Sequence, residues 1–191
     1  MNETELIEGL KARDEDSFKM LVENYKDRIF NLCFGYLRNA NEAEDLAQEV
    51  FIEIYNSIEK FKGNSSLQTW IYRIAVNETL QLIRKQKAQK RFGFLSSLFG
   101  QEDKLDSHYR ENFHPGVALE NKERSRVLFS AIDRLSENQR TAFLLSKIEG
   151  KSYQEIAEIM QTSISSIESL LYRAKSNLKK QLGHYYKNKA L

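Results

Sequence analysis

The sequence predicts an all-α protein made of two small helical domains joined by a linker. Three observations support this fold class. Proline occurs once and glycine eight times in 191 residues, so few residues interrupt helices. Apolar residues recur at steps of three and four along most of the chain. The segment 93–120 breaks that pattern and holds the only proline and three of the glycines. We therefore expect domains at 1–92 and 121–191, with 93–120 as the linker.

The first domain is expected to contain three long helices. Apolar periodicity predicts the first over about 15–37. Asn41 has the side chain of an N-cap, which predicts a second helix over about 42–60 with acidic residues in its first turn. Ser65, with a glutamine three residues later, forms a capping-box pattern. It predicts the start of a third helix that includes residues 69–91.

The second domain is expected to contain four helices. The first spans about 123–135, and Ser136 caps the next. Ser152, with a glutamate three residues later, caps a short helix over 153–160. A two-residue turn follows, and Ser163 then caps a long final helix to about residue 182. The last two helices form a helix–turn–helix pattern.

Charge is distributed unevenly along the chain. Residues 1–60 carry 7 Lys or Arg against 14 Asp or Glu, whereas residues 61–92 carry 7 against 1. Residues 125–191 are again basic, with 11 against 6. The pattern indicates two kinds of partner, one of them a polyanion, although solvated helix faces would give the same counts.

Several classes of protein are excluded by composition. No apolar run reaches the roughly 18 residues that span a bilayer, so we expect no membrane insertion. The acidic N-terminus does not resemble a signal peptide, which favours a cytoplasmic protein. Cys33 lies in an apolar run and is expected to be a core residue. The histidines show no metal-ligand spacing, and we expect no metal, cofactor or catalytic residue. The acidic cluster around Asp45 suits a helix start or a protein interface better than a catalytic site.

The final helix carries a face suited to the major groove of DNA. Ser165, Ser166, Ser169 and Arg173 lie opposite its apolar stripe. Small hydroxyl side chains allow close approach to base edges, and arginine can reach a phosphate or a guanine. Plain packing of two helices explains the same spacing, and the pattern alone does not decide between the two.

The segment 69–91 combines an aromatic start with a basic end. Trp70, Arg73, Asn77 and Arg84 share one face of the predicted helix, and we expect that face to point outward. An indole can stack on an unpaired base, while arginine and asparagine contact phosphates and base edges. In the alternative, Trp70 is a half-buried core residue and the basic end is solvated.

These stretches together resemble a known family. The stretch EAEDLAQEVFIEIYNSIEKF, followed by SSLQTWIYRIAVNETLQLIRKQ, resembles region two of bacterial sigma factors. The stretch RLSENQRTAFLLSKIEGKSYQEIAEIMQTSISSIESLLYRAKSNLKKQL resembles their region four. Two domains with a short linker are similar to the extracytoplasmic-function (ECF) group of the sigma-70 family. The resemblance implies promoter-specific transcription initiation with core RNA polymerase and no enzymatic activity.

The resemblance also implies roles for individual residues. Region two would dock on the β′ clamp helices of the polymerase, using Asp45, Gln48 and Glu49. A loop with Lys62, Asn64, Ser65 and Ser66 would capture a flipped base of the −10 element. Region four would read the −35 element and touch the β flap. The implied DNA contacts are Trp70, Arg73, Asn77 and Arg84 at the −10 element, and Ser163, Ser165, Ser166, Ser169 and Arg173 at the −35 element.

The resemblance further implies partners for this chain, and it implies a distance between two promoter elements that the linker must span. The partners are core RNA polymerase, promoter DNA and an anti-sigma factor. The promoter elements lie about 25 base pairs apart, or about 85 Å at ~3.4 Å each. A free coil of the 28 linker residues spans only about 30 Å. We therefore expect the polymerase to hold the domains apart.

The alternative is a stand-alone helix–turn–helix regulator that binds DNA half-sites without polymerase.

The chain departs from the family pattern in region four. Gln161 stands in the helix–turn–helix turn where glycine is common. If that position requires positive φ, the glutamine costs about 1 kcal/mol. Glu168 and Leu170 stand where basic residues are common, so the −35 contact is expected to use fewer charges.

Overall fold

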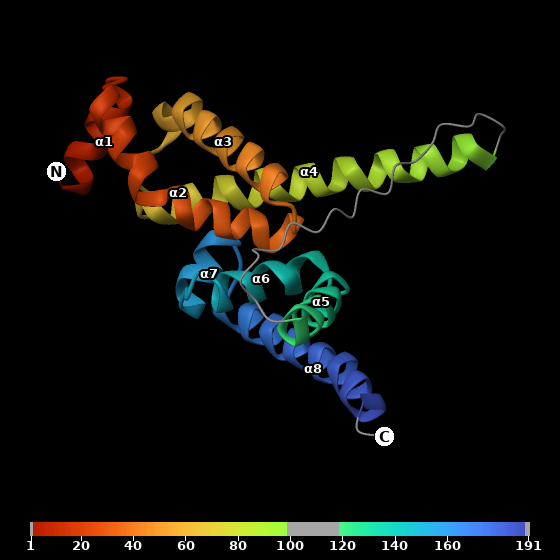
Figure 1. The fold of residues 1–191 in the computed structure, drawn as a ribbon. Coiled ribbons are helices and arrows are strands. Elements are labelled where there is room, and N and C mark those ends of the chain that lie inside the picture. Colours follow the sequence, from red (N-terminus) through yellow and green to blue (C-terminus); the bar gives the residue numbers. More distant parts are fainter. Residues whose placement is uncertain (1, 99–118, 190–191) are drawn as a thin grey trace.

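The computed structural model describes residues 2–98 and 119–189, and within these ranges the fold is entirely helical (Figure 1). This confirms the predicted fold class. Most of the expected linker lies outside the described residues. The elements are α1 (Glu3–Lys11), α2 (Glu15–Leu37), α3 (Ala40–Ser57), the 3-10 helix η1 (Ile58–Lys60), α4 (Leu67–Leu98), α5 (Leu119–Asp133), α6 (Glu137–Lys147), α7 (Tyr153–Ile159) and α8 (Ile164–Lys189).

The first domain is built from α1 to α4 around one apolar core. Leu21 and Ile29 of α2, Ile54 of α3 and Ile71 of α4 are all fully buried. Burial of each such side chain contributes about 1.5–3 kcal/mol. The helix α1 adds Leu6 and other apolar residues to the core, and the sequence patterns above did not predict this helix.

Two helix starts differ from the predicted caps. The side-chain oxygen of Asn39, not Asn41, accepts hydrogen bonds from the backbone at the start of α3. Similarly, Ser66 rather than Ser65 caps α4, because its Oγ accepts a hydrogen bond of 3.1 Å from the Thr69 amide. The expected caps at Ser136 and Ser152 are confirmed. Neighbouring Ser and Asn residues offer the same chemistry, so pattern alone does not decide between adjacent positions.

The second domain is built from α5 to α8. Ile156 and Ala157 of α7 and Ile167 and Leu171 of α8 are buried where these two helices pack. Ile164, the first residue of α8, is 47% exposed, whereas Ile167 and Leu171 further along the helix are buried.

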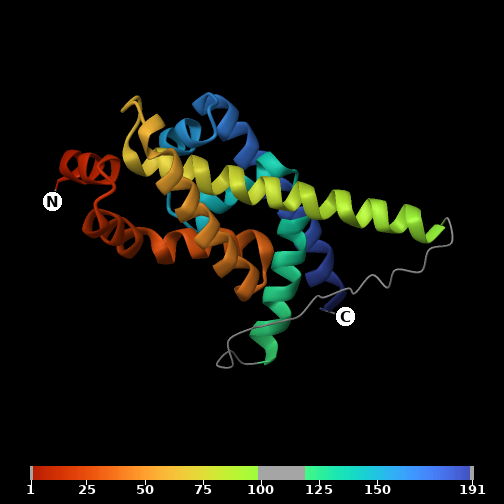
Figure 2. The ribbon, with the colours of Figure 1, turned by 90° about the horizontal axis from the view of Figure 1, so that it is seen from above.

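The two domains pack against each other in this structure. The helices α6 and α7 contact α2 and α4, and the C-terminal part of α4 projects beyond the rest of the body (Figures 1 and 2). The sequence patterns did not predict this contact, because residues that pack between domains follow the same spacing as residues that pack within one.

Candidate functional site

The first candidate surface is the outer face of α3. Asp45, Gln48 and Glu49 are all exposed, and they lie opposite the buried residues of the same helix. Ile52, one turn further on, is 59% exposed, which is unusual for isoleucine. The structure therefore brings the three predicted residues together and adds an apolar neighbour. Ile52 lies outside the apolar stripe of Leu46, Val50 and Ile54. Its exposure could therefore have been predicted from the sequence.

The second candidate surface is the loop that precedes α4. Lys62, Asn64 and Ser66 are exposed, and Ser65 is half-buried. Gly63 has φ +73°, a conformation that favours glycine. The loop is held at its far end, because Glu3 of α1 accepts a hydrogen bond of 3.2 Å from the Leu67 amide. The loop therefore presents exposed polar side chains beside Gly63, where a Cβ would meet nothing within 4 Å.

The third candidate surface lies along α4. Trp70 is half-buried and packs on Phe61, with ring centroids 5.4 Å apart. The Arg73 Nε donates to the backbone carbonyl of Glu158 in the second domain at 3.0 Å. Arg84 forms an ion pair of 3.0 Å with Glu137, also in the second domain. The expectation that this whole face points to solvent is wrong for Trp70 and Arg73, which are half-buried, the first against Phe61 and the second against the second domain. Asn77 and Arg84 are exposed, although Arg84 reaches Glu137.

A small cavity lies where α4 meets α6 and α7. Its volume is about 130 Å³, and Arg73 and Asn77 line it together with Asn138 and Gln161 from the second domain. Pockets for small-molecule ligands usually measure about 300–1,000 Å³. The cavity therefore suits a few water molecules rather than a cofactor.

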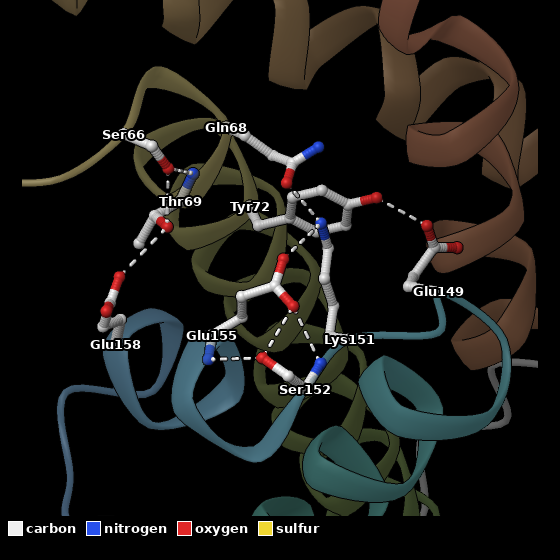
Figure 3. Close-up of polar contacts among 9 residues, drawn as sticks. All are labelled: Ser66, Gln68, Thr69, Tyr72, Glu149, Lys151, Ser152, Glu155 and Glu158. Atoms are coloured by element: carbon white, nitrogen blue, oxygen red, sulfur yellow. Dashed lines mark hydrogen bonds and ion pairs between the residues drawn. The ribbon is translucent and has the colours of Figure 1, made fainter.

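A polar network joins the start of α4 to the segment between α6 and α7 (Figure 3). The buried Lys151 Nζ donates to Gln68 Oε1 at 2.6 Å and lies 4.4 Å from the centre of the Tyr72 ring. The Tyr72 hydroxyl donates to Glu149 Oε2 at 2.5 Å. A buried ammonium is tolerated only with partners, and both an amide oxygen and an aromatic face supply them here.

Burial also shifts the acidity of this network. It raises the pKa of the Glu149 carboxyl above its usual value, although the Tyr72 hydrogen bond, Lys151 and Arg28 act in the opposite direction. Burial raises the pKa of Tyr72 as well, and the Glu149 carboxyl adds to that rise. Tyr72 therefore stays a neutral hydrogen-bond donor.

The fourth candidate surface is the outer face of α8. Ser163, Ser165, Ser169 and Arg173 are exposed, while Ser166 is half-buried. The Ser163 Oγ accepts a hydrogen bond of 3.2 Å from the Ser166 amide, so it also starts the helix. The structure thus brings all five predicted −35 residues to one end of α8.

Two further residues share the outer face of α8. Glu168 and Tyr172 line a shallow groove with Ser169 and Arg173, and Tyr172 is 76% exposed. A glutamate accepts hydrogen bonds from cytosine, and an aromatic ring contacts the thymine methyl group. The large exposed aromatic on an otherwise small polar face was the available sequence signal.

The turn before α8 carries backbone strain. Gln161 has φ +52°, a left-handed conformation that side chains other than glycine and asparagine seldom adopt. Position 161 therefore has the positive φ at which a glutamine costs about 1 kcal/mol relative to glycine. The turn is nevertheless closed by two backbone hydrogen bonds, from Gln161 N to Glu158 O and from Thr162 N to Ala157 O.

Other kinds of site find little support in the described part of the chain. No three His, Cys, Asp or Glu side chains gather there as a metal site. None of the described helices combines the length and apolar character needed to cross a membrane. Cys33 is buried near Thr79, and burial raises the pKa of its thiol to about 12.

Comparison with known proteins decides the family. The model of sigma-70 region 2 matches residues 21–89, and a model of sigma-70 region 4 matches residues 125–178. A curated relative, the ECF RNA polymerase sigma factor SigW of Bacillus subtilis (strain 168), is 34% identical over 92% of this chain and 94% of its own. The chain belongs to the ECF group of the sigma-70 family. The ECF RNA polymerase sigma-E factor of Haemophilus influenzae is 31% identical, with 93% of both chains covered.

Two solved structures share the fold. CnrH in complex with the cytosolic domain of CnrY gives a TM-score of 0.69 at 18% identity, covering 95% of this chain and 97% of that one. The sigma factor RpoE of Bartonella quintana, in complex with the anti-sigma factor NepR, gives 0.62 at 23% identity, with 87% and 96% covered. At these identities the likeness concerns the fold alone.

The family assignment confirms the expected resemblance and the expected role as a sigma factor. It supports an initiation factor rather than a stand-alone regulator, since the relatives are named RNA polymerase sigma factors. Sigma factors form a non-catalytic family of transcription initiation factors. The roles of the individual residues in this sigma factor remain predictions.

Proposed function

We propose that this sigma factor joins core RNA polymerase and directs it to promoters through three separate surfaces. Its domain of residues 1–92 docks through Asp45, Gln48 and Glu49 of α3 on the β′ clamp helices. Its domain of residues 121–191 reads the −35 element with α8 and touches the β flap. The observation that carries this proposal is the exposure of both the α3 face and the α8 face in one chain that contains both sigma regions in order.

The proposed docking surface is suited to a basic partner. Exposed carboxylates of Asp45 and Glu49 lie beside the apolar side chain of Ile52. Charge complementarity guides association, and a central apolar contact adds stability once water is excluded. Ile52 therefore belongs to the proposed interface, together with the three predicted polar residues.

The −10 element is proposed to meet the α4 face and the loop before it. Lys62, Asn64, Ser65 and Ser66 form the capture site for an unpaired base. Trp70, Arg73, Asn77 and Arg84 then follow the strand away from that site. Stacking is worth about 1–3 kcal/mol per base and offsets the few kcal/mol needed to unpair it.

We further propose an anti-sigma partner and a cytoplasmic site of action. The fold is shared with the sigma factor RpoE of Bartonella quintana, which was solved in complex with the anti-sigma factor NepR. Core polymerase and promoter DNA are both cytoplasmic in bacteria, which supports the proposed location. We expect this chain itself to hold no metal or cofactor in that function.

The experiment that tests the function is in vitro transcription. Purified chain and core RNA polymerase are incubated with a DNA library that has random sequence upstream of one reporter. We expect transcripts whose templates share two short motifs about 25 base pairs apart. Core polymerase alone is the control for background initiation. Transcription that does not depend on the added chain would overturn the proposal.

A further inference from the structure

Glu168 lies on the outer face of α8, among the residues proposed to read the −35 element. Its side chain is exposed and lines the shallow groove of α8 together with Ser169, Tyr172 and Arg173. An α-helix turns by about 100° per residue, so Glu168 and Arg173 lie about 140° apart around its axis, with Ser169 and Tyr172 between them. The groove therefore carries a carboxylate along one side and a guanidinium along the other.

The serines in the first turn of α8 already bond to one another. Ser163 Oγ lies 3.0 Å from Ser165 Oγ and 2.9 Å from Ser166 Oγ, and it also accepts from the Ser166 amide. A hydroxyl has one donor and two acceptor sites, and it can rotate to suit either kind of base edge. These serines therefore discriminate little between bases. Stronger discrimination requires a side chain of fixed chemistry further along the helix.

Two charged side chains of this face are held differently. Arg173 Nε donates to the Ser169 carbonyl one turn earlier at 3.2 Å, which ties the guanidinium to its own helix. Glu168 forms no hydrogen bond or ion pair with any residue in the described part of the chain. Its carboxylate is therefore free to accept hydrogen bonds from a ligand in the groove.

The chemistry of a carboxylate restricts which base it can meet. An ionised carboxylate accepts hydrogen bonds and cannot donate them. In the major groove only cytosine and adenine present an amino donor, at N4 and at N6. Adenine also presents the N7 acceptor beside that donor, which repels a carboxylate, whereas guanine and thymine present acceptors alone. Cytosine is therefore the base whose edge fits Glu168 best.

A carboxylate in the major groove also carries a cost that does not depend on sequence. Phosphates line both edges of the groove, and their negative charges repel Glu168 in every complex. A basic residue, which is common at this position in the family, would instead attract phosphates beside any base. At position 168 of this chain only a hydrogen bond from a base offsets the repulsion. Glu168 therefore acts on specificity, because it weakens binding to sites that lack the donor.

We propose that Glu168 is a specificity-determining residue, through which this sigma factor selects promoters with a cytosine at one position of the −35 element. The inference rests on the proposed function, since it takes the outer face of α8 as the surface that reads this element. Glu168 determines the preference at that single position, and other side chains of α8 determine the remaining ones.

The test measures base preference with the holoenzyme. The full chain and core RNA polymerase transcribe templates with random sequence upstream, and the templates that give transcripts are sequenced. We expect cytosine at one −35 position to be enriched about tenfold over guanine and thymine. Glu168→Gln keeps the shape of the side chain and adds an amide donor, which suits N6 and N7 of adenine. We expect this variant to prefer adenine at that position and to keep its other preferences.

Two further variants separate base reading from charge. Glu168→Ala removes both the acceptor and the repulsion, so we expect no preference at that position and unchanged preferences elsewhere. The matched control is Glu8→Gln on α1, where an exposed glutamate loses the same charge, and it should select the motif of the unmodified chain. Circular dichroism of each variant should equal that of the unmodified chain, because both substituted positions are exposed.

Three results would overturn the proposal. The same cytosine preference in Glu168→Gln and in the unmodified chain would show that another side chain reads that position. Stronger use of every template by the variants, without a change in preference, would show that Glu168 only repels phosphates. A −35 motif without a selected cytosine in the unmodified chain would count equally against it.

Failure of the proposed function gives a different result. If transcription does not depend on the added chain, the role with polymerase is wrong, and base preference is then measured with the chain alone. Duplexes of random sequence are selected at low salt on the immobilised full chain and sequenced. Cytosine selected by the unmodified chain and adenine by Glu168→Gln would leave Glu168 as a base-reading residue. Identical sequences from both chains would overturn the inference as well.

Discussion

Two helices of the first domain, α3 and α4, differ in how exposed their proposed functional faces are. The outer face of α3 is open, with Gln48 and Glu49 exposed. On the corresponding face of α4, Arg73 is half-buried and bonds to Glu158 of the second domain, while Arg84 pairs with Glu137 but stays exposed. Both helices belong to one domain, so Arg73 is covered by the second domain, whereas Trp70 is covered by Phe61 of its own domain. The difference indicates that core polymerase can bind α3 without rearrangement, whereas DNA can contact Arg73 only after the second domain moves.

The largest expected effect concerns the open face. Glu49→Lys reverses a charge at the centre of the proposed docking surface. We expect about a hundredfold weaker binding to core polymerase, equivalent to ~2.8 kcal/mol. Titration of labelled protein with core polymerase measures it. The matched control is Glu8→Lys on α1, an exposed glutamate with the same charge change, which should bind normally. Equal binding by both variants would remove α3 from the interface.

The next effect concerns Trp70 on α4 and Asn64 in the loop before it. Trp70→Ala and Asn64→Ala should each slow open-complex formation about tenfold or more, because stacking and capture of unpaired bases is lost. Initial binding of the holoenzyme should change less. Permanganate reactivity of the melted strand follows the opening over time. Tyr172→Ala is the aromatic control on α8, and it should alter promoter binding instead. Unchanged reactivity in the Trp70 and Asn64 variants would exclude both residues from melting.

A smaller effect concerns the turn of the helix–turn–helix formed by α7 and α8. Gln161→Gly should raise the free energy of unfolding by about 1 kcal/mol, because glycine relieves the cost of the left-handed φ of +52°. Thermal unfolding measures the gain. Gln161→Ala keeps the strained backbone and should give no such gain. A stabilisation of the same size in the alanine variant would assign the effect to the lost side chain.

The smallest expected effect is a response of the domain contact to pH. Burial raises the pKa of Glu149 while the domains are packed, whereas solvent restores its ordinary value near 4.5 after separation. The packed form therefore holds this proton more tightly, and packing should strengthen as pH falls through the raised pKa toward 4.5. Tyr72, Lys151 and Arg28 face the carboxyl, and the raised pKa of Tyr72 keeps its hydroxyl neutral in that window. Energy transfer between dyes on cysteines introduced at the exposed Lys11 and Lys179 should rise as pH falls, and it should stay flatter when Glu149→Gln is added. Identical profiles would show that Glu149 is not the group that responds.

The sequence allowed most of the fold to be predicted, but not the packing between the domains. Apolar periodicity predicted α2 over the residues observed, and the cap at Ser152 was placed correctly. Errors arose where neighbouring residues share the same chemistry, as at Asn39 and Asn41. The helix α1 was missed because it is short and its apolar residues are few.

For the candidate sites too, some features could be predicted from the sequence and others could not. Exposed polar residues on α3 and α8 follow from helical periodicity, since the opposite faces are apolar. The partner of Arg73 could not be predicted, because the bond to Glu158 joins residues 85 positions apart in the chain. Periodicity identifies the face that a residue occupies, but it contains no information about which distant segment covers that face.

The central claim is that the domains bind a promoter only after polymerase separates them. A footprint on a promoter selected from the transcription library tests this directly, with the full chain alone and with core polymerase. We expect protection of both the −10 and the −35 element with polymerase, and weak or absent protection without it. Equal protection of both elements by the free chain would contradict the account.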